Sequence, residues 1–174
     1  SDEIRHPVVA TVRAPLVTVP PPSFRHALGY LVRHLAAAAA SPLRYARALG
    51  SAWRQRTWGE FLRGGWLAAQ LARDGVAHLH AHFISTPAEV AAAVSAMSGM
   101  PFSISAHAKD IYTSRDTDLQ RRLRAARFTV TCTEANRRAL AALAPEAQVQ
   151  RMYHGIDNGL FQPGRRQPAS GAPL

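Results

Sequence analysis

The chain has 174 residues, of which 47% are hydrophobic, and a formal net charge of +10 at pH 7. This length fits one domain with a sizeable core, and no apolar run reaches the roughly 18 residues that argue for a membrane-spanning helix. The single cysteine, Cys132, excludes an internal disulfide framework. It also suits a reducing compartment, so we expect the chain to lie in the cytoplasm.

The positive charge is unevenly distributed, because residues 24–66 hold seven arginines but only one acid, Glu60. All three tryptophans lie in the same segment. Two interpretations stay open. Arginines and aromatic rings on helices suit a membrane interface or another anionic partner, or else the arginines lie on solvated helix faces above an aromatic core. The sequence contains no known nucleic-acid-binding motif, so no nucleic-acid partner is expected.

Residues 1–22 are expected to be irregular with one short extended run, and residues 23–74 to be helical. The first helix follows Ser23 and carries apolar side chains at helical spacing, namely Leu28, Leu31, Val32 and Leu35. The second begins at Pro42, a tolerated first position. The third opens with a capping-box pattern at residues 57–60 and ends near Gly75.

Strand and helix patterns alternate between residues 75 and 163. Strands are predicted at residues 76–82, 102–106, 128–132 and 148–153. The intervening helices open at the capping patterns Thr86 to Glu89 and Thr117 to Gln120, and at Thr133. Short right-handed crossovers between these strands predict a parallel sheet and a doubly wound, Rossmann-like α/β fold. Residues 164–174 are rich in Gly, Pro, Ser and Arg and are expected to begin an interdomain linker.

Polar residues follow the ends of all four predicted strands, where ligands bind in sheets of this kind. We therefore predict a substrate site formed by His80, His82, His107, Lys109, Asp110, Thr133, Glu134, His154, Gly155 and Asp157. The segment around His107 is the most informative. It follows a strand directly, and Lys109 is the only lysine in the chain. His107 is the candidate catalytic residue.

The alternating residues His78, His80 and His82 support a rival hypothesis. They would project from one face of a strand, where they could share a zinc ion in a metal-dependent hydrolase. However, helices cover both faces of a buried parallel strand, so only its last residues reach the ligand crevice. We therefore expect His78 to be a hydrogen-bonded core histidine, and we expect no metal site.

Four sequence blocks resemble, in order and spacing, those of retaining glycosyltransferases of family 4, which have two Rossmann-like domains in the GT-B architecture. The blocks are HLHAHF at 78–83, PFSISAHAKDIY at 101–112, FTVTCTEANRRAL at 128–140 and RMYHGIDNGLFQP at 151–163. The chain departs from the family pattern at Ala108, where the family usually has glycine, and at His154, where it usually has asparagine.

This resemblance implies that residues 1–163 form part of an acceptor-side domain. It implies a nucleotide-sugar donor bound mainly by a C-terminal domain, a saccharide or lipid-linked acceptor, retention of configuration and no metal or other cofactor. His107 matches the family histidine that faces the donor sugar. We expect an enzyme of polysaccharide or glycolipid biosynthesis, acting in the cytoplasm or at the inner face of the membrane. The family's first strand and C-terminal domain are expected outside this chain, which alone would be inactive. The alternatives remain a metal-dependent hydrolase or a basic module that binds anionic lipid or nucleic acid.

Overall fold

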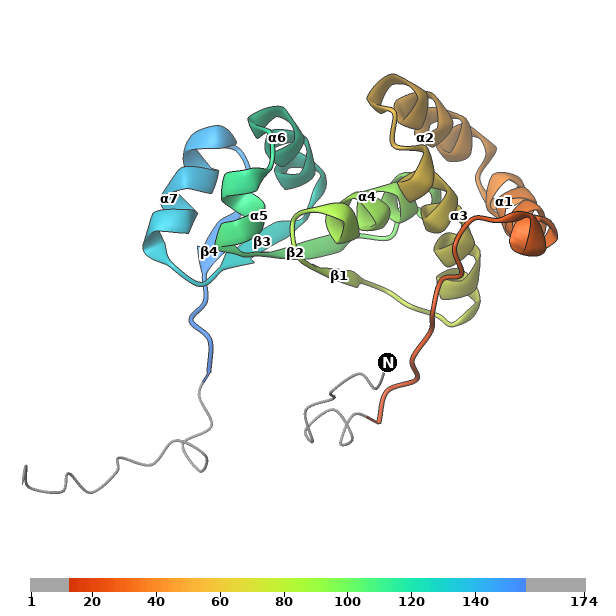
Figure 1. Ribbon diagram of the computed structural model, residues 1–174, viewed down its shortest axis with the longest axis horizontal. Coiled ribbons are helices and arrows are strands. Elements are labelled where there is room, and N and C mark those ends of the chain that lie inside the picture. The colour runs from red at the N-terminus through yellow and green to blue at the C-terminus, as the bar shows by residue number, and fades with distance from the viewer. Residues whose placement is uncertain (1–12, 156–174) are drawn as a thin grey trace, which may run out of the picture.

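A computed structural model describes residues 13–155 as a parallel sheet flanked by helices (Figure 1). A short 3₁₀ turn, Phe24–His26, precedes the regular elements. The helices are α1 (Ala27–Ala40), α2 (Pro42–Gln55), α3 (Trp58–Arg73), α4 (Thr86–Ser98), α5 (Ala108–Thr113), α6 (Asp116–Ala125) and α7 (Glu134–Leu143). The strands are β1 (Leu79–His82), β2 (Phe102–Ala106), β3 (Phe128–Thr131) and β4 (Val149–Arg151).

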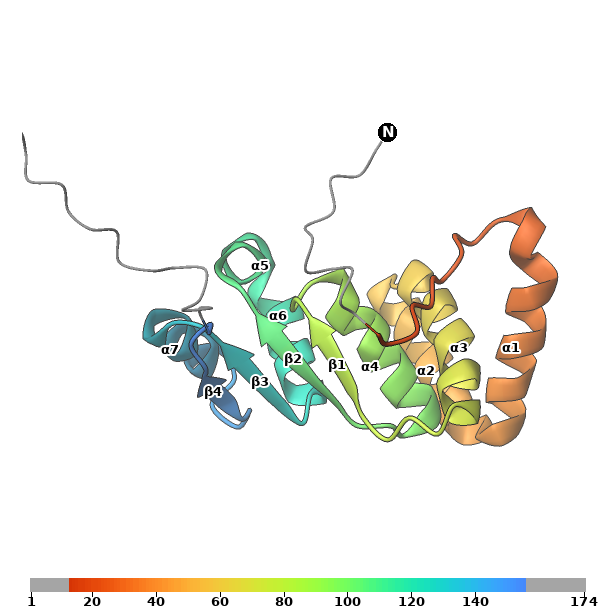
Figure 2. The same cartoon turned by 90° about the horizontal axis from the view of Figure 1, so that it is seen from below.

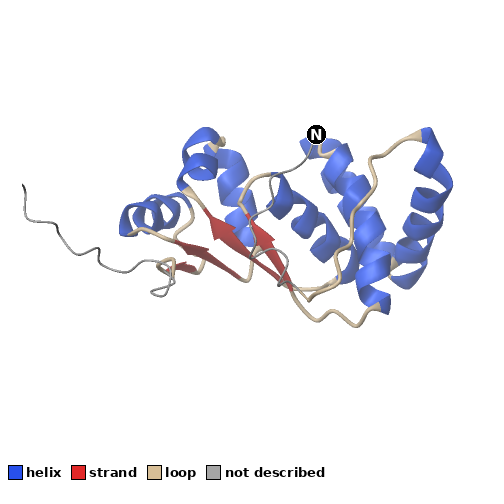
Figure 3. Cartoon of the chain, turned by 60° about the horizontal axis from the view of Figure 1, so that its bottom comes forward, coloured by secondary structure: helices blue, strands red, loops and turns tan. Residues whose placement is uncertain are grey.

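The sheet confirms the parallel α/β class, with its four strands in the order β1-β2-β3-β4. The strands are added in one direction only, so right-handed crossovers place α4, α6 and α7 on the same face. Seen from below, β1 and β2 lie in front of α4 and α6 (Figure 2), and Figure 3 shows the same separation of strands from helices. The winding does not reverse among the described strands, so the finer expectation of a doubly wound sheet, with helices on both faces, is not shown within residues 13–155.

Two hydrophobic clusters hold the structure together. The first lies between the sheet and its helices and includes Phe102, Ile104, Leu119, Leu123 and Leu140, which are almost fully buried. The second joins α2, α3 and the second half of α4, and it includes the buried residues Ala48, Ala52, Phe61, Ala68, Val94 and Met97. The three N-terminal helices thus form a layer beside the β1 side of the sheet (Figure 1).

Several element boundaries match the sequence prediction because local signals determine them. Helix α2 begins at Pro42, and β2 has the predicted bounds. Thr133 caps α7, where its hydroxyl accepts a hydrogen bond from the backbone NH of Asn136 at 3.1 Å. The apolar stripe of α1 is different. The four apolar residues of the predicted stripe are exposed, namely Leu28, Leu31, Val32 and Leu35. The buried side chains of α1 are those of Tyr30, His34 and Ala37.

Glu89 does not complete the capping box that the sequence predicted at the start of α4. The residue before that helix is Ser85, which makes no side-chain cap. Instead, Glu89 is 6% exposed and accepts hydrogen bonds of 2.6 and 2.7 Å from Arg121 and one of 3.0 Å from Nε of Arg122. Burial raises the pKa of Glu89, but the two arginines outweigh it and lower this pKa overall. The cluster ties α4 to α6.

Close packing of α1 against α3 depends on Gly65, because a Cβ atom there would overlap the ring of His34. His34 is buried between the two helices. Its Nε2 lies 3.1 Å from the carbonyl oxygen of Leu62, which can only accept, so Nδ1 accepts from the hydroxyl of Tyr45 at 2.9 Å. Burial lowers the pKa of His34, which favours this neutral form.

We expect Gly65→Ala to destabilise the protein by about 1–3 kcal/mol, because overpacking the His34 ring outweighs the higher helix propensity of alanine. Gly50→Ala is the matched control. Gly50 also lies within a helix, but a Cβ there would meet only the flexible side chain of Arg54, at 3.6 Å. Urea denaturation should show the control unchanged or more stable. Equal stability of the two variants would contradict the role of Gly65.

Candidate functional site

The alternating histidines lie on the sheet face that the described helices leave uncovered. His78, His80 and His82 are all exposed, so the prediction that His78 is a core residue is wrong. The cause is the single direction of winding among the described strands, which leaves this face of the sheet without a helical layer from residues 13–155. Nε2 of His78 lies 2.9 Å from the hydroxyl of Ser103, and the His80 ring lies 2.8 Å from the hydroxyls of both Ser103 and Ser105.

On this open face, the described histidine and serine side chains form a hydrogen-bond network rather than a metal site. Burial lowers the pKa of His80, as do the neighbouring His82 and His78. Both ring nitrogens of His80 already have serine partners. Within residues 13–155, the side chains close enough to share a metal ion are instead those of His107, Cys132 and His154.

A hollow of about 150 Å³ opens at the carboxyl ends of β1, β2 and β3, beside the segment that follows β4. His82, His107, Cys132 and His154 line it, together with Tyr153. The His107 ring lies between the other two imidazoles, with ring centroids 4.7 Å from His82 and 5.6 Å from His154. The His154 and His107 rings are nearly parallel, at 17°. Residues from four strand ends thus converge on one space.

His107 directly follows β2, in extended backbone conformation, and precedes α5. Its side chain is half-buried. Burial lowers the pKa of His107, the charges of His82 and His154 lower it further, and Asp110 opposes them. The lowered pKa favours the neutral imidazole, which can donate one hydrogen bond and accept another. Its Nε2 is buried, and no residue in the described part of the chain offers it a partner.

Lys109 and Asp110 lie on the short helix α5. Neither lines the hollow. Lys109 is exposed, and its carbonyl accepts a hydrogen bond from the hydroxyl of Thr113 at 2.7 Å. Asp110 is half-buried, and its Oδ2 has no hydrogen-bond partner among residues 13–155. Asp110 thus influences His107 through its charge.

Thr133, Glu134 and Gly155 were also predicted as site residues, but none of them lines the hollow. Thr133 is the cap of α7, and Glu134 pairs with Arg137, which lowers the pKa of its carboxyl to about 2. Gly155 is exposed, and a Cβ there would meet nothing within 4 Å, so no close approach to the described residues requires this glycine. Asp157 lies outside the described residues.

Two residues at the site were not predicted as functional. Phe83 follows β1 with a φ angle of 99°, which a non-glycine residue rarely adopts, and its ring lies 5.2 Å from that of His107. Strained backbone of this kind concentrates at functional sites. The other residue is Cys132, which the sequence analysis placed inside the strand predicted at residues 128–132, whereas β3 ends at Thr131 and Cys132 directly follows it.

Comparisons with protein-family models, with curated proteins and with solved structures give no match. Between residues 13 and 155, no helix is both long and apolar enough to cross a membrane. The arrangement of side chains described above is therefore the basis for assigning a function.

Proposed function

We propose that the chain is the acceptor-side part of a retaining glycosyltransferase, with His107 as the catalytic residue that contacts the donor sugar. The observation that supports this most directly is the convergence of His82, His107 and His154 on one hollow at the carboxyl edge of a parallel sheet. Ligands of parallel α/β sheets bind at this edge. Each of the four sequence blocks that resemble glycosyltransferases supplies one of the residues that line this hollow, namely His82, His107, Cys132 and His154.

The chemistry of the hollow suits a sugar better than an anion. A neutral imidazole donates one hydrogen bond and accepts another, as each sugar hydroxyl does. With its pKa lowered by burial and by His82 and His154, His107 is a poor base. We propose that it orients a hydroxyl of the donor sugar and stabilises the charge that develops during transfer, rather than removing a proton.

The direct test uses the natural polypeptide that carries these residues, incubated with individual nucleotide sugars and with saccharide or lipid-linked acceptors. Release of a nucleoside diphosphate together with a product of retained anomeric configuration, measured by NMR, is the expected result. The His82→Ala variant should raise KM or lower kcat. Acceptor-independent cleavage of an ester or amide that requires added zinc would instead favour the hydrolase hypothesis.

A second candidate, binding to an anionic membrane surface, is favoured by the exposed apolar face of the first helical segment. Phe24, Leu28, Leu31, Val32 and Leu35 are all exposed there. Beside them lies a groove of about 760 Å³ between α1, α3 and α4, lined largely by alanine and aliphatic side chains. An exposed apolar face flanked by arginines is typical of helices that lie in a membrane interface.

We expect the protein to float with vesicles that contain anionic lipid, and the binding to weaken as salt is added. Changing Leu28, Leu31 and Leu35 together to serine should abolish flotation without unfolding, because all three are exposed. Changing Arg44, Arg47, Arg54 and Arg56 to serine should weaken it through loss of charge. Neutral phosphatidylcholine vesicles are the control. Unchanged flotation of both variants would rule out this surface.

A further inference from the structure

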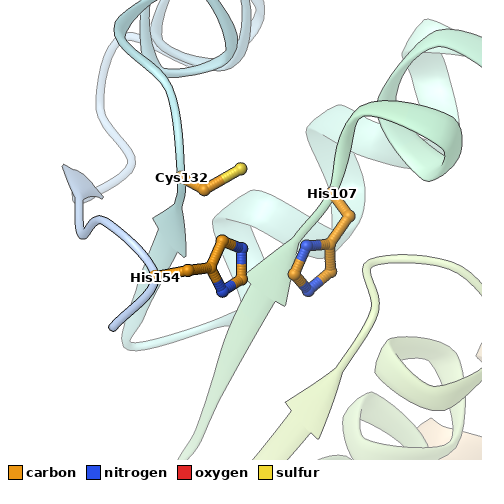
Figure 4. A group of neighbouring side chains, drawn as sticks. All are labelled: His107, Cys132 and His154. Atoms are coloured by element: carbon orange, nitrogen blue, oxygen red, sulfur yellow. The ribbon is translucent and has the colours of Figure 1, made fainter. Parts of the chain in front are cut away.

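His107, Cys132 and His154 form a cluster of donor atoms that the glycosyltransferase proposal leaves unexplained. One ring nitrogen of each histidine and the Sγ atom of Cys132 all lie within 4.8 Å of one another. Figure 4 shows the three side chains, from the ends of β2 and β3 and from the segment after β4, pointing toward a common space. Cys132 is a free, half-buried thiol.

The sheet itself holds these three positions together. Ala106 of β2 pairs with Thr131 of β3, so the residues that follow them, His107 and Cys132, occupy neighbouring positions at the carboxyl edge. The NH of Met152 donates to the carbonyl of Thr131 at 2.9 Å, which fixes the start of the segment that carries His154. The cluster is therefore anchored by backbone hydrogen bonds rather than assembled by chance contact of surface side chains.

A separate observation indicates that a ligand belongs in this space. Nε2 of His107 is buried, and the described part of the chain supplies no group to hydrogen-bond with it. Buried polar atoms are nearly always satisfied in folded proteins, so such an atom calls for a specific explanation. A ligand bound in the hollow would provide one.

We propose that His107, Cys132 and His154 bind a zinc ion. Imidazole nitrogen and thiolate sulfur are the ligands that zinc prefers, and three protein ligands with water in the fourth position make an open tetrahedral site. The ligand atoms of such a site lie roughly 3.4–3.6 Å apart, so the side chains must approach one another by about an ångström. His154 is exposed and free to do so.

Zinc binding would release the thiol proton of Cys132 to solvent and occupy His107. The ion would therefore compete with a sugar in the hollow, and zinc would act as an inhibitor of the proposed enzyme. The site itself does not depend on the proposed function, because it requires only the three side chains. It also differs from the zinc site that the sequence suggested at His78, His80 and His82.

The test titrates the full chain, produced without a histidine tag, with Co²⁺ as a spectroscopic substitute for zinc. A thiolate-to-cobalt charge-transfer band must come from Cys132, since it is the only cysteine in the sequence. We expect this band together with the intense visible absorption of tetrahedral cobalt, and we expect one equivalent of Zn²⁺ to abolish both. Zinc should also raise the melting temperature of the chain.

Variants assign the ligands. Cys132→Ser should remove the charge-transfer band, and His107→Gln or His154→Gln should weaken cobalt binding by more than about 100-fold, because loss of even an outer-shell partner costs 10–100-fold. His78→Gln is the matched control and should bind normally. Circular dichroism of the metal-free variants checks that each folds. Absence of the thiolate band in the unaltered chain, or zinc binding that survives in Cys132→Ser but is lost in His78→Gln, would overturn the proposal.

Discussion

Replacement of His107 by alanine should lower kcat of the proposed glycosyltransferase by about 100-fold or more, because one positioned group of this kind contributes about 2.7–4 kcal/mol to a transition state. The His107 ring lies between His82 and His154 at the carboxyl edge of the sheet. Its Nε2 is buried and has no hydrogen-bond partner among the described residues. Its loss should affect kcat more than KM, since the proposed contact strengthens as charge develops during transfer. The measurement is initial-rate kinetics together with a thermal melt of both proteins.

His78→Ala provides the control for this experiment. His78 lies on the open sheet face, hydrogen-bonded to Ser103 and stacked on the ring of Phe128 with centroids 6.1 Å apart. It does not line the hollow. Because its side chain is exposed, we expect little effect on either turnover or stability. Full activity of the His107→Ala variant would contradict the catalytic role of His107, whatever the result for His78→Ala.

Replacement of Glu89 by alanine should destabilise the fold by about 3–5 kcal/mol, because it leaves two partly buried arginines without their shared counterion. The side chains of Arg121 and Arg122 are only 26% and 13% exposed. For a chain of this size, the melting temperature should fall by roughly 6–20 °C. The glutamine variant keeps the shape and one acceptor, so it should fall between the unaltered protein and the alanine variant.

The pH dependence distinguishes the ion pair from simple packing. The folded-state pKa of Glu89 lies below its ordinary value of 4.5, so the pair contributes stability above that pH and loses it as the pH falls through the folded-state value. The stability difference between the unaltered protein and Glu89→Gln should therefore shrink in acid. Glu146→Gln is the control, because Glu146 and its partner Arg124 are exposed, and it should melt normally at neutral pH. A difference that is constant with pH would contradict the ion pair.

The strands and most helices were predictable because their signals are local. Alternating or β-branched apolar residues define β2 and β3, Pro42 begins α2, and Thr133 caps α7. The tertiary contacts of each element could not be predicted from these local signals. Glu89 fits a capping box when read with its three preceding residues, but its partners lie more than 30 residues away in α6. Likewise, the spacing of Leu28, Leu31, Val32 and Leu35 indicates an apolar stripe on a helix. It does not indicate whether another element packs against that stripe.

The position of the site at the carboxyl edge of the sheet could be predicted from the sequence, but the full set of side chains that form it could not. The order of the strands places His82, His107 and His154 at one edge, where the polar residues after the predicted strands indicated a site. The prediction for His78 failed because it assumed a second helical layer, which is a property of strand order rather than of any residue. Cys132 attracted no functional interpretation, because a lone cysteine gains a role only when the register brings histidines beside it.

Helix α4 belongs to both hydrophobic clusters, and this has a consequence for how the protein opens. Its first half contributes Ala88 and Ala91 to the cluster beneath the sheet, and its second half contributes Val94 and Met97 to the cluster among the N-terminal helices. Neither cluster can lose its packing without exposing part of α4. The two layers are therefore coupled into one cooperative unit, and the amide hydrogens of α4 should be among the slowest in the chain to exchange with solvent.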